Sequence, residues 1–219
     1  MKVLIGSNNP SKVRFMAEML GRLGEVECLS PADLGISISV EENGSSAVDN
    51  ARLKAAAFHK ASGLPVLCED SGLYFAEFPM DDPRQPGIHA RRIGGKTLDD
   101  EEMIAYYSAL AKQYGTLHAC YSNAYAAADA NGRVEVFFQD DPRDPVFFDA
   151  FGFLLCDTPH PHREPGWPID ALSKDPYFER YYYDIADNEF LISALDGRRA
   201  AKACFRERWD RFMCVFFQL

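Results

Sequence analysis

The polar hexapeptide at residues 7–12, Ser-Asn-Asn-Pro-Ser-Lys, has the composition of a phosphate-binding loop. It separates a short apolar run from an amphipathic stretch, and a strand, a polar loop and a helix often bind phosphate together. The helix N-terminus attracts anions through its free N–H groups and its partial positive charge. Lys12 adds a full positive charge, and Ser7 and Asn8 can donate hydrogen bonds. The Walker pattern is absent, and in a simpler interpretation Ser7 or Asn9 only caps the helix.

Carboxylates further along the chain could hold a divalent cation beside such a loop. Glu41-Glu42 lies in a polar segment, and residues 70–72, Asp-Ser-Gly, follow a buried apolar run. Residues at the carboxyl ends of strands face the ligand crevice in open α/β sheets. Mg²⁺ takes one or two carboxylates together with phosphate oxygens, so it could join Asp70 to an anionic substrate. Taken singly, Glu41-Glu42 is a solvated pair, residues 70–72 form a turn, and Lys54 is a surface lysine. Their occurrence together favours a shared site.

Strands and helices alternate in the first half of the chain and would position these residues. Apolar periodicity and turn residues predict the elements that follow. We expect strands at 1–5, 26–29 and 65–68, helices at 12–23, 45–62 and 99–114, a hairpin at 118–128 and 133–139, irregular chain beyond 140 to 183, and a C-terminal helix at 193–212. Gly63 is the expected end of the second helix. This alternation favours a mixed α/β fold.

Composition limits the classes of function. With 219 residues and 47% hydrophobic content, the chain is expected to form a single domain over 1–219. A net charge of -10 argues against a nucleic acid polymer as partner, although one cationic pocket can still bind a small anion. We expect no membrane partner, since no apolar run approaches the ~18 residues of a membrane span. Six scattered cysteines suggest reduced thiols and a cytoplasmic protein, with Cys68 a buried strand residue.

The order of the motifs resembles the inosine triphosphate pyrophosphatase family. The resemblance covers about residues 1–95 and rests on Ser7-x-Asn9-x-x-Lys12, Glu41-Glu42-x-Gly44, Asn50-Ala51-x-x-Lys54-Ala55, Gly63-Leu64-Pro65-Val66, Asp70-Ser71-Gly72-Leu73 and Pro86-Gly87-Ile88. Glu69 stands in place of the first aspartate of the family's D-D-S-G motif. Arg92 stands at the arginine position of P-G-I-Y-S-A-R. The family hydrolyses (deoxy)nucleoside triphosphates with non-standard purines to monophosphate and pyrophosphate.

The resemblance implies a fold and a division of labour. It implies an elongated, twisted mixed sheet flanked by helices, two lobes with a cleft between them, and a homodimer. One lobe, mainly 1–100, would carry the phosphate and metal site, and the part at 140–219 would recognise the base. The triphosphate would contact Ser7, Asn8, Asn9, Lys12 and Lys54, and Ser71 would contact the nucleotide. Glu41 and Asp70 would hold Mg²⁺, and Asp70 would also activate water. Lys12 and Lys54 would assist catalysis.

The second half of the chain matches the family at only some positions. Asp175 and Arg198 match, and we place them with Arg92 among the substrate-binding residues. Other residues occupy positions at which the family reads the base: Leu172, Lys174, Ile192 and Gly197. The resemblance therefore leaves the preferred base open. Hydrolysis of another modified nucleotide, or nucleotide binding without turnover, are the alternative functions.

Overall fold

The computed structural model describes residues 1–139, 141, 145–185 and 196–219, and divides into two compact units. The first unit comprises Met1–Ser71, Asn123–Gln139 and Cys204–Leu219. The second comprises Gly72–Ser122 and Asp140–Ala203. The lobe limits expected from the sequence, 1–100 and 140–219, stay a prediction.

Parallel and antiparallel strands occur together in the described part of the chain. The strands of the main sheet are β1 (Lys2–Ile5), β2 (Glu27–Leu29), β3 (Val66–Phe75), β6 (Leu117–Ala128), β7 (Val134–Phe138), β8 (Phe153–Leu155) and β9 (Ser173–Lys174). They are hydrogen-bonded in the order β2-β1-β3-β6-β8-β9, with β7 beside β6. β1 is parallel to β2 and β3, whereas β6, β7, β8 and β9 pair antiparallel. Two short strands, β4 (Arg92–Ile93) and β5 (Lys96–Thr97), form a separate hairpin. The predicted mixed α/β fold is confirmed.

Side chains cap the N-termini of α1 (Pro10–Gly21), α2 (Ala47–Ser62) and α3 (Asp100–Tyr114). The other described helices are α4 (Pro145–Phe151), α5 (Tyr182–Ile185), α7 (Asp196–Phe217) and the 3-10 helix η1 (Pro168–Leu172). Ser46 caps α2, and Asp99 forms a reciprocal capping box with Glu102 at α3. α2 ends at Gly63, whose φ of 68° is the left-handed conformation that glycine adopts without a Cβ clash.

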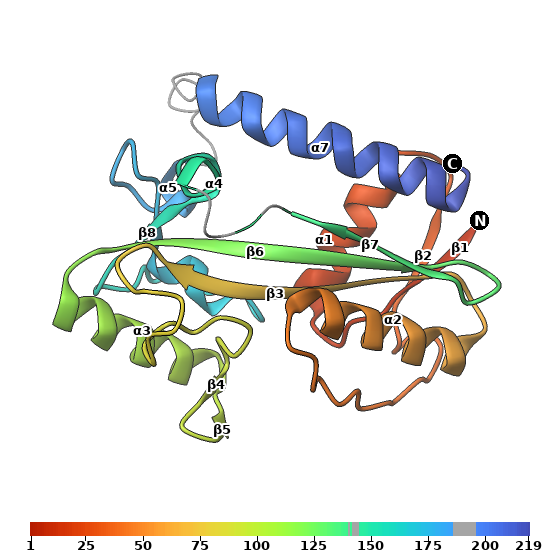
Figure 1. Ribbon diagram of the computed structural model, residues 1–219, viewed down its shortest axis with the longest axis horizontal. Helices are drawn as coiled ribbons and strands as arrows, with labels where there is room; N and C mark the ends of the chain where they lie inside the picture. The colour runs from red at the N-terminus through yellow and green to blue at the C-terminus, as the bar shows by residue number, and fades with distance from the viewer. Residues whose placement is uncertain (140, 142–144, 186–195) are drawn as a thin grey trace. The chain divides into compact units, whose positions relative to one another are not determined.

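In the first unit, helices cover both faces of the strands. α1 and the C-terminal part of α7 share one apolar core with residues of β1, β3, β6 and β7, at whose centre Trp209 is fully buried. On the opposite face, Phe58 of α2 lies against Gly6, immediately after β1. Figure 1 shows α2 and α7 on opposite sides of the strands. β3 is therefore covered from both sides, which explains its fully buried Val66-Leu67-Cys68 run.

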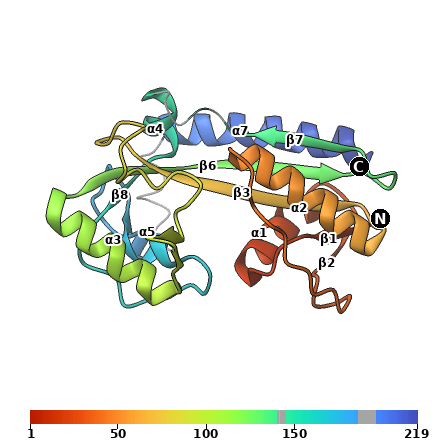
Figure 2. The ribbon, with the colours of Figure 1, turned by 60° about the horizontal axis from the view of Figure 1, so that its bottom comes forward.

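The second unit has its own core around α3. Tyr107 of α3 is fully buried among apolar residues of β3, β6, β8 and η1. Its hydroxyl donates a 2.7 Å hydrogen bond to the carbonyl of Ala90, so the polar end of the ring is satisfied. α3 packs against η1 and β8, as Figure 2 shows for α3 and β8. Leu172 of η1 is also fully buried in this core.

Three sequence expectations need correction or extension. The strand expected at 65–68 continues as β3 to Phe75, so residues 70–72 lie inside a strand and the turn interpretation is wrong. The chain beyond 140 is more regular than expected, because it forms α4, β8, η1, β9 and α5. The C-terminal helix extends to Phe217, and residues 193–195 of its expected start lie outside the described residues. No helix within the described residues is long and apolar enough to span a bilayer.

Candidate active site

The polar loop between β1 and α1 is organised by Asn9. The Asn9 Oδ1 atom accepts hydrogen bonds from the backbone N–H of Ser11 at 2.9 Å and of Lys12 at 3.3 Å. The backbone N–H of Asn9 in turn donates to Ser7 Oγ at 3.1 Å. Pro10 occupies the first helical position, where its missing N–H costs nothing. Asn9 is therefore the helix cap that the simpler interpretation predicted, and this cap fixes the direction in which Lys12 leaves α1.

Gly6 attaches this loop closely to β3. Its N–H donates a 2.9 Å hydrogen bond to the carbonyl of Leu67, and its carbonyl accepts one from Cys68 Sγ at 3.3 Å. A Cβ on Gly6 would lie 2.4 Å from Cys68 Sγ and 2.7 Å from the Phe58 ring. Only glycine fits this approach without a shift of its neighbours. Burial raises the pKa of Cys68 to about 12, so its thiol is neutral and is not a nucleophile.

Lys54 joins two carboxylates from different segments of the first unit. Its Nζ atom lies 2.5 Å from Asp70 Oδ1 and 2.7 Å from Glu42 Oε1. The side chains of Lys54 and Asp70 are only 16% and 10% exposed, so solvent screens this triad weakly. Burial by itself disfavours the charged form of Lys54, but the attraction of Asp70 and Glu42 outweighs it and raises the pKa of Lys54. The lysine is therefore a fixed positive charge.

Lys12 forms the second lysine–carboxylate pair. Its Nζ atom lies 2.6 Å from Glu69 Oε2, and the Glu69 side chain is 9% exposed. Successive side chains of a strand point to opposite faces, so Glu69 and Asp70 of β3 face different sides. Glu69 meets Lys12 from α1, and Asp70 meets Lys54 from α2. Lys12 also lowers the pKa of Asp70 slightly, which places both lysines within electrostatic reach of that carboxylate.

The second oxygen of Asp70 is suited to a cation. Asp70 Oδ2 is buried and has no hydrogen-bond partner among the described residues. Burial raises the pKa of Asp70, and the positive charge of Lys54 opposes this shift. A buried carboxylate oxygen without a partner is costly, and a hard divalent cation would satisfy it. In the described part of the chain, no three His, Cys, Asp or Glu side chains are grouped as metal ligands. The carboxylates of Asp70 and Glu42 are hard oxygen donors, the type that a divalent cation such as Mg²⁺ takes together with phosphate oxygens.

Glu42, rather than Glu41, contacts the lysine of this site. Glu41 is exposed, whereas Glu42 is half-buried and ion-paired with Lys54. Sequence reasoning did not separate the two, and the role of Glu41 as a metal ligand stays a prediction. Sequence reasoning also assigned no role to Asn50, although Asn50 and Lys54 are four residues apart and so share a helix face. The four-residue spacing from Lys54 could have indicated that Asn50 belongs to the site.

The remaining predicted residues are distributed over both units. Ser71 is half-buried in β3, and Asn8 is exposed in the loop. In the second unit, Arg92 is an exposed residue of β4. Asp175 is 1% exposed, and its Oδ1 atom accepts hydrogen bonds from the backbone N–H groups of residues 177 and 178. Arg198 belongs to α7, but its side chain lies outside the described residues.

Two of the four residues at base-reading positions have defined contacts in the second unit. Leu172 is fully buried in the core, and Lys174 places its Nζ atom 4.8 Å from the centre of the Tyr181 ring. Ile192 lies outside the described residues, and Gly197 belongs to α7.

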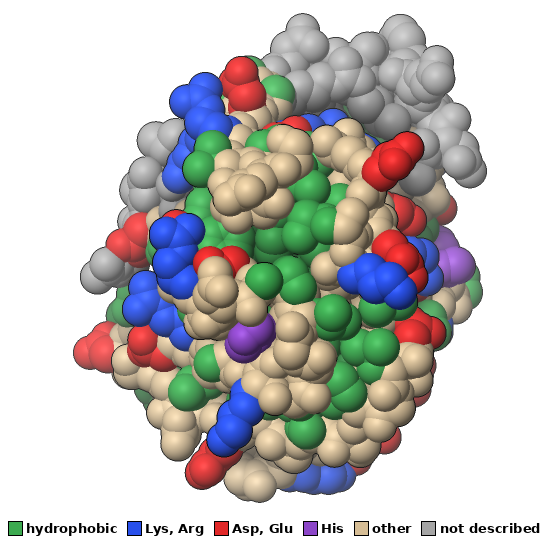
Figure 3. Space-filling view, turned by 90° about the vertical axis from the view of Figure 1, so that its right-hand side faces the viewer, with side chains coloured by type: hydrophobic (Ala, Val, Ile, Leu, Met, Phe, Trp, Pro, Cys, Tyr) green, Lys and Arg blue, Asp and Glu red, His purple; other side chains and the backbone are tan. Residues whose placement is uncertain are grey.

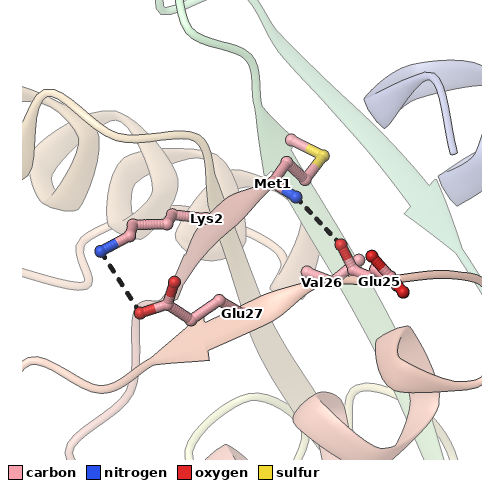
Figure 4. Close-up of a pocket in the computed structure, with 5 residues that line it drawn as sticks. All are labelled: Met1, Lys2, Glu25, Val26 and Glu27. Carbon is pink, nitrogen blue, oxygen red and sulfur yellow. Dashed lines mark hydrogen bonds and ion pairs between the residues drawn. The ribbon is translucent and has the colours of Figure 1, made fainter.

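A hollow at the other end of β1 carries no such chemistry. It is lined by Met1, Lys2, Glu25, Val26 and Glu27. Figure 4 shows two contacts in it: Lys2 Nζ lies 3.3 Å from Glu27 Oε1, and the terminal amine donates to the backbone carbonyl of Glu25 at 2.9 Å. Lys2 and Glu27 are more than half exposed, so this pair is weak. The buried triad around Lys54 is the better candidate.

The second unit contains a different polar cluster. Asp170 of η1 is largely buried, and burial together with the negative charge of Glu164 raises its pKa to about 6. Burial, Asp170 and Glu164 also raise the pKa of Tyr183 to about 12. The Tyr183 ring packs against His160 and His162, with ring centres 5.2 and 4.4 Å apart. Asp170 and Tyr183 thus lie near the negative charge of Glu164, in contrast to the lysine-paired carboxylates of β3.

Fold and site together define a mixed α/β protein whose capped loop, two lysines and paired carboxylates suit a phosphorylated ligand with a divalent cation. The model of the Ham1 family matches residues 3–142, and the chain belongs to this family. This confirms the family predicted from the motifs.

The chain is similar to curated proteins and to solved structures. A dITP/XTP pyrophosphatase of Thermus thermophilus is 33% identical over 164 residues, which are 68% of this chain and 76% of the relative. Two solved structures are 24% identical and share the fold. A HAM1 protein from Coxiella burnetii has a TM-score of 0.61 over 83% of this chain and 85% of its own. A nucleoside-triphosphatase, also called dITP/XTP pyrophosphatase, from Mycobacterium abscessus has a TM-score of 0.59 over 93% and 98%.

Proposed function

We propose that the protein is a Mg²⁺-dependent pyrophosphatase of non-standard purine nucleoside triphosphates such as dITP and XTP. It converts them to the nucleoside monophosphate and pyrophosphate. The observation that carries the proposal is the Lys54 triad, in which a buried lysine joins Asp70 and Glu42 while Asp70 Oδ2 stays without a partner. Membership of the Ham1 family and the name of the Thermus thermophilus relative support the choice of substrate.

The residues of the first unit divide the work. The charge of Lys12 and the positive end of the α1 dipole attract the triphosphate, with Ser7, Asn8 and Asn9 as hydrogen-bonding neighbours. Lys54 contributes a second positive charge that stays protonated at neutral pH. Both lysines stabilise the negative charge that accumulates on the phosphate oxygens during transfer.

Asp70 is the proposed general base. Its Oδ1 atom is held by Lys54, so Oδ2 is the oxygen left to accept a proton from the attacking water. The water oxygen bonds to the phosphorus nearest the nucleoside, the bond to the bridging oxygen breaks, and pyrophosphate leaves with the electron pair. An ionised carboxylate oxygen has two acceptor positions, so Oδ2 can serve both a cation and this proton. A pKa raised by burial favours proton acceptance by Asp70.

Glu42 and Asp70 are the residues proposed to hold Mg²⁺, with Glu41 as the second predicted ligand. Bound Mg²⁺ would neutralise phosphate charge and assist departure of pyrophosphate. Ser71, next to Asp70 in β3, is proposed to contact the nucleotide. Arg92, Asp175 and Arg198 of the second unit are proposed to contact the substrate as well.

The protein is further proposed to act on free nucleotides in the cytoplasm, as a homodimer. All six cysteines are free thiols, as expected where thiols stay reduced. On the face drawn in Figure 3, Lys and Arg side chains alternate with Asp and Glu around a hydrophobic area. This mixture, with a net charge of -10, supports a small anionic substrate over a nucleic acid polymer.

Product identity tests the proposed function. The protein is incubated with Mg²⁺ and a panel of triphosphates that includes dITP, ITP, XTP and the four standard ribonucleotides, and pyrophosphate and orthophosphate are assayed separately. We expect pyrophosphate from the non-standard purines. Release of orthophosphate alone would contradict cleavage next to the nucleoside.

Hydrolysis of another modified nucleotide is the second candidate, and the burial of Leu172 favours it. Leu172 stands where the family is expected to stack a phenylalanine on the base, but it is fully buried in the core of the second unit. Loss of a stacking ring costs about 1–3 kcal/mol per base. Faster turnover of a modified pyrimidine than of dITP in the same panel would establish this candidate. Nucleotide binding by calorimetry without any product would instead establish a binding module.

A further inference from the structure

We propose that Asn50 is a positioning residue that holds Glu42 at the Lys54 triad by binding the backbone of Gly44. Glu42 lies in a stretch without helix or strand, which ends where α2 begins. A carboxylate on such a stretch needs an anchor if it is to stay near a partner on α2. The proposal rests on the proposed function of this site, but its first test does not depend on turnover.

The anchor is a hydrogen bond between a buried side chain and the stretch. Gly44 N–H donates to Asn50 Oδ1 at 2.9 Å, and Asn50 is only 1% exposed. The approach is close, because a Cβ on Gly44 would lie 2.5 Å from Asp49 Cβ and 2.7 Å from Asn50 Oδ1. Glycine at 44 and an acceptor at 50 are therefore required together.

The spacing of α2 couples this anchor to the triad. Asn50 and Lys54 are four residues apart, so they stand one above the other on the same helix face. Asn50 binds the backbone at Gly44, and Lys54 binds the side chain at Glu42 at 2.7 Å. The two contacts are thus two residues apart on the stretch and one turn apart on the helix. Asn50 acts on Glu42 through the backbone.

Other hydrogen bonds at the start of α2 do not reach Glu42. The Asp49 carboxylate accepts hydrogen bonds from the hydroxyls of Ser45 and Ser46, and the Asp49 backbone N–H donates the N-cap bond to Ser46 Oγ. These contacts cap α2 and fix residues 45 and 46. The Asn50 bond reaches the stretch at Gly44, which is nearer to Glu42 in sequence than Ser45 and Ser46 are. Loss of the cap should therefore destabilise α2, whereas loss of the Asn50 acceptor should displace Glu42.

The first test measures the substrate-free protein. Asn50→Leu keeps the approximate volume and removes the acceptor, and Asn50→Asp keeps the acceptor. Amide hydrogen exchange at Gly44 should be protected in the wild type and in Asn50→Asp and accelerated in Asn50→Leu. Mn²⁺ binding, followed by paramagnetic resonance without nucleotide, should weaken by about 10- to 100-fold in Asn50→Leu, the usual effect of losing an outer partner of a metal ligand.

The second test uses activity and a matched control. The Mg²⁺ concentration for half-maximal turnover should rise in Asn50→Leu and return toward the wild-type value in Asn50→Asp. Asn123→Leu is the control, since Asn123 donates a 2.7 Å side-chain hydrogen bond to Gln139 elsewhere in the first unit. It should affect the unfolding midpoint as Asn50→Leu does and leave the Mg²⁺ dependence unchanged.

Gly44→Ala approaches the same bond from the other partner. Its Cβ should displace the stretch and reproduce the loss of Mn²⁺ affinity, and the double variant with Asn50→Leu should lose no more than either single variant. The proposal is overturned if Asn50→Leu binds Mn²⁺ and responds to Mg²⁺ like the wild type. It is also overturned if Asn50→Leu and Gly44→Ala lose affinity additively.

If Asn50→Leu does not fold, Gly44 exchange in Asn50→Asp and Mn²⁺ binding by Gly44→Ala decide the same question. A wild type without pyrophosphate release would contradict the proposed function and leave the exchange result standing.

Discussion

The buried aspartates Asp70 of the first unit and Asp170 of the second lie beside charges of opposite sign. In the first unit, Asp70 and Glu69 on β3 are each ion-paired with a lysine from a helix. In the second unit, Asp170 is largely buried near Glu164, and its pKa is raised to about 6. Pairing with a lysine keeps a buried carboxylate available as an anion, whereas burial beside a like charge favours protonation. Burial raises the pKa of both aspartates, but a lysine opposes that shift at Asp70, whereas Glu164 adds to it at Asp170.

Asp70→Asn should give the largest effect. The change removes the anion while preserving shape, and loss of a general base typically lowers turnover by about 10²–10⁴-fold. Pyrophosphate release under saturating dITP and Mg²⁺ is the measurement. The circular dichroism spectrum should match the wild type, because Lys54 retains Glu42 as a partner. An active Asp70→Asn protein would remove Asp70 from its proposed role.

Lys54→Met should follow, with a loss of about 10²–10³-fold in kcat/KM, the range seen when one stabilising donor is removed from a reaction site. The matched control is Lys2→Met, which removes an exposed lysine whose partner is Glu27. Steady-state kinetics should show a loss for Lys54→Met and none for Lys2→Met. Equal losses in both variants would mean that the buried triad has no special role.

Asp170→Asn should reveal a carboxylate without a lysine partner through the pH dependence of stability. The pKa of Asp170 is about 6 in the folded protein and 3.8 as the ordinary value, so the folded state binds more protons between these values. Stability contributed by the protonated carboxyl is present below pH 3.8 and is lost as pH rises through 6. Asp170→Asn should therefore raise the free energy of unfolding at pH 7 by at most about 3 kcal/mol relative to its effect at pH 3.5. Denaturant titrations at the two pH values measure this, and an equal effect at both would refute the assignment.

Gly6→Ala should weaken the attachment to β3 of the polar loop between β1 and α1. The added Cβ meets Cys68 Sγ at 2.4 Å, and such overpacking costs about 1–3 kcal/mol. Gly21→Ala is the control, since nothing lies within 4 Å of its Cβ and alanine favours a helix. Thermal unfolding should show a lower midpoint for Gly6→Ala and an unchanged or higher one for Gly21→Ala. A Gly6→Ala protein as stable as the wild type would show that the contact relaxes freely.

Local features of the site were predictable because they depend on neighbours in the sequence. Asn9 caps α1 through bonds to residues two and three positions away, and Gly63 ends α2 in the left-handed conformation that favours glycine. The spacing of Asn50 and Lys54 on one helix face is likewise readable from the order of residues.

The strand through Asp70 was misjudged for a reason that also lies in the sequence. Asp, Ser and Gly are typical turn residues, and β propensity disfavours them. In the structure, β3 continues through them to Phe75. Pairing with neighbouring strands and cover by helices on both faces outweigh that local preference.

The sequence by itself determined the candidate residues of the proposed site: Lys12, Lys54 and Asp70, and an acidic residue at 41 or 42. Only the tertiary structure decided their partners. Glu42 meets Lys54, Glu69 meets Lys12, and Asp70 keeps one oxygen without a partner among the described residues. These contacts join segments 12 to 57 residues apart, and their geometry depends on how β3 is placed between α1 and α2. Propensity and spacing act over a few residues, so they carry no information on which of two adjacent glutamates points inward.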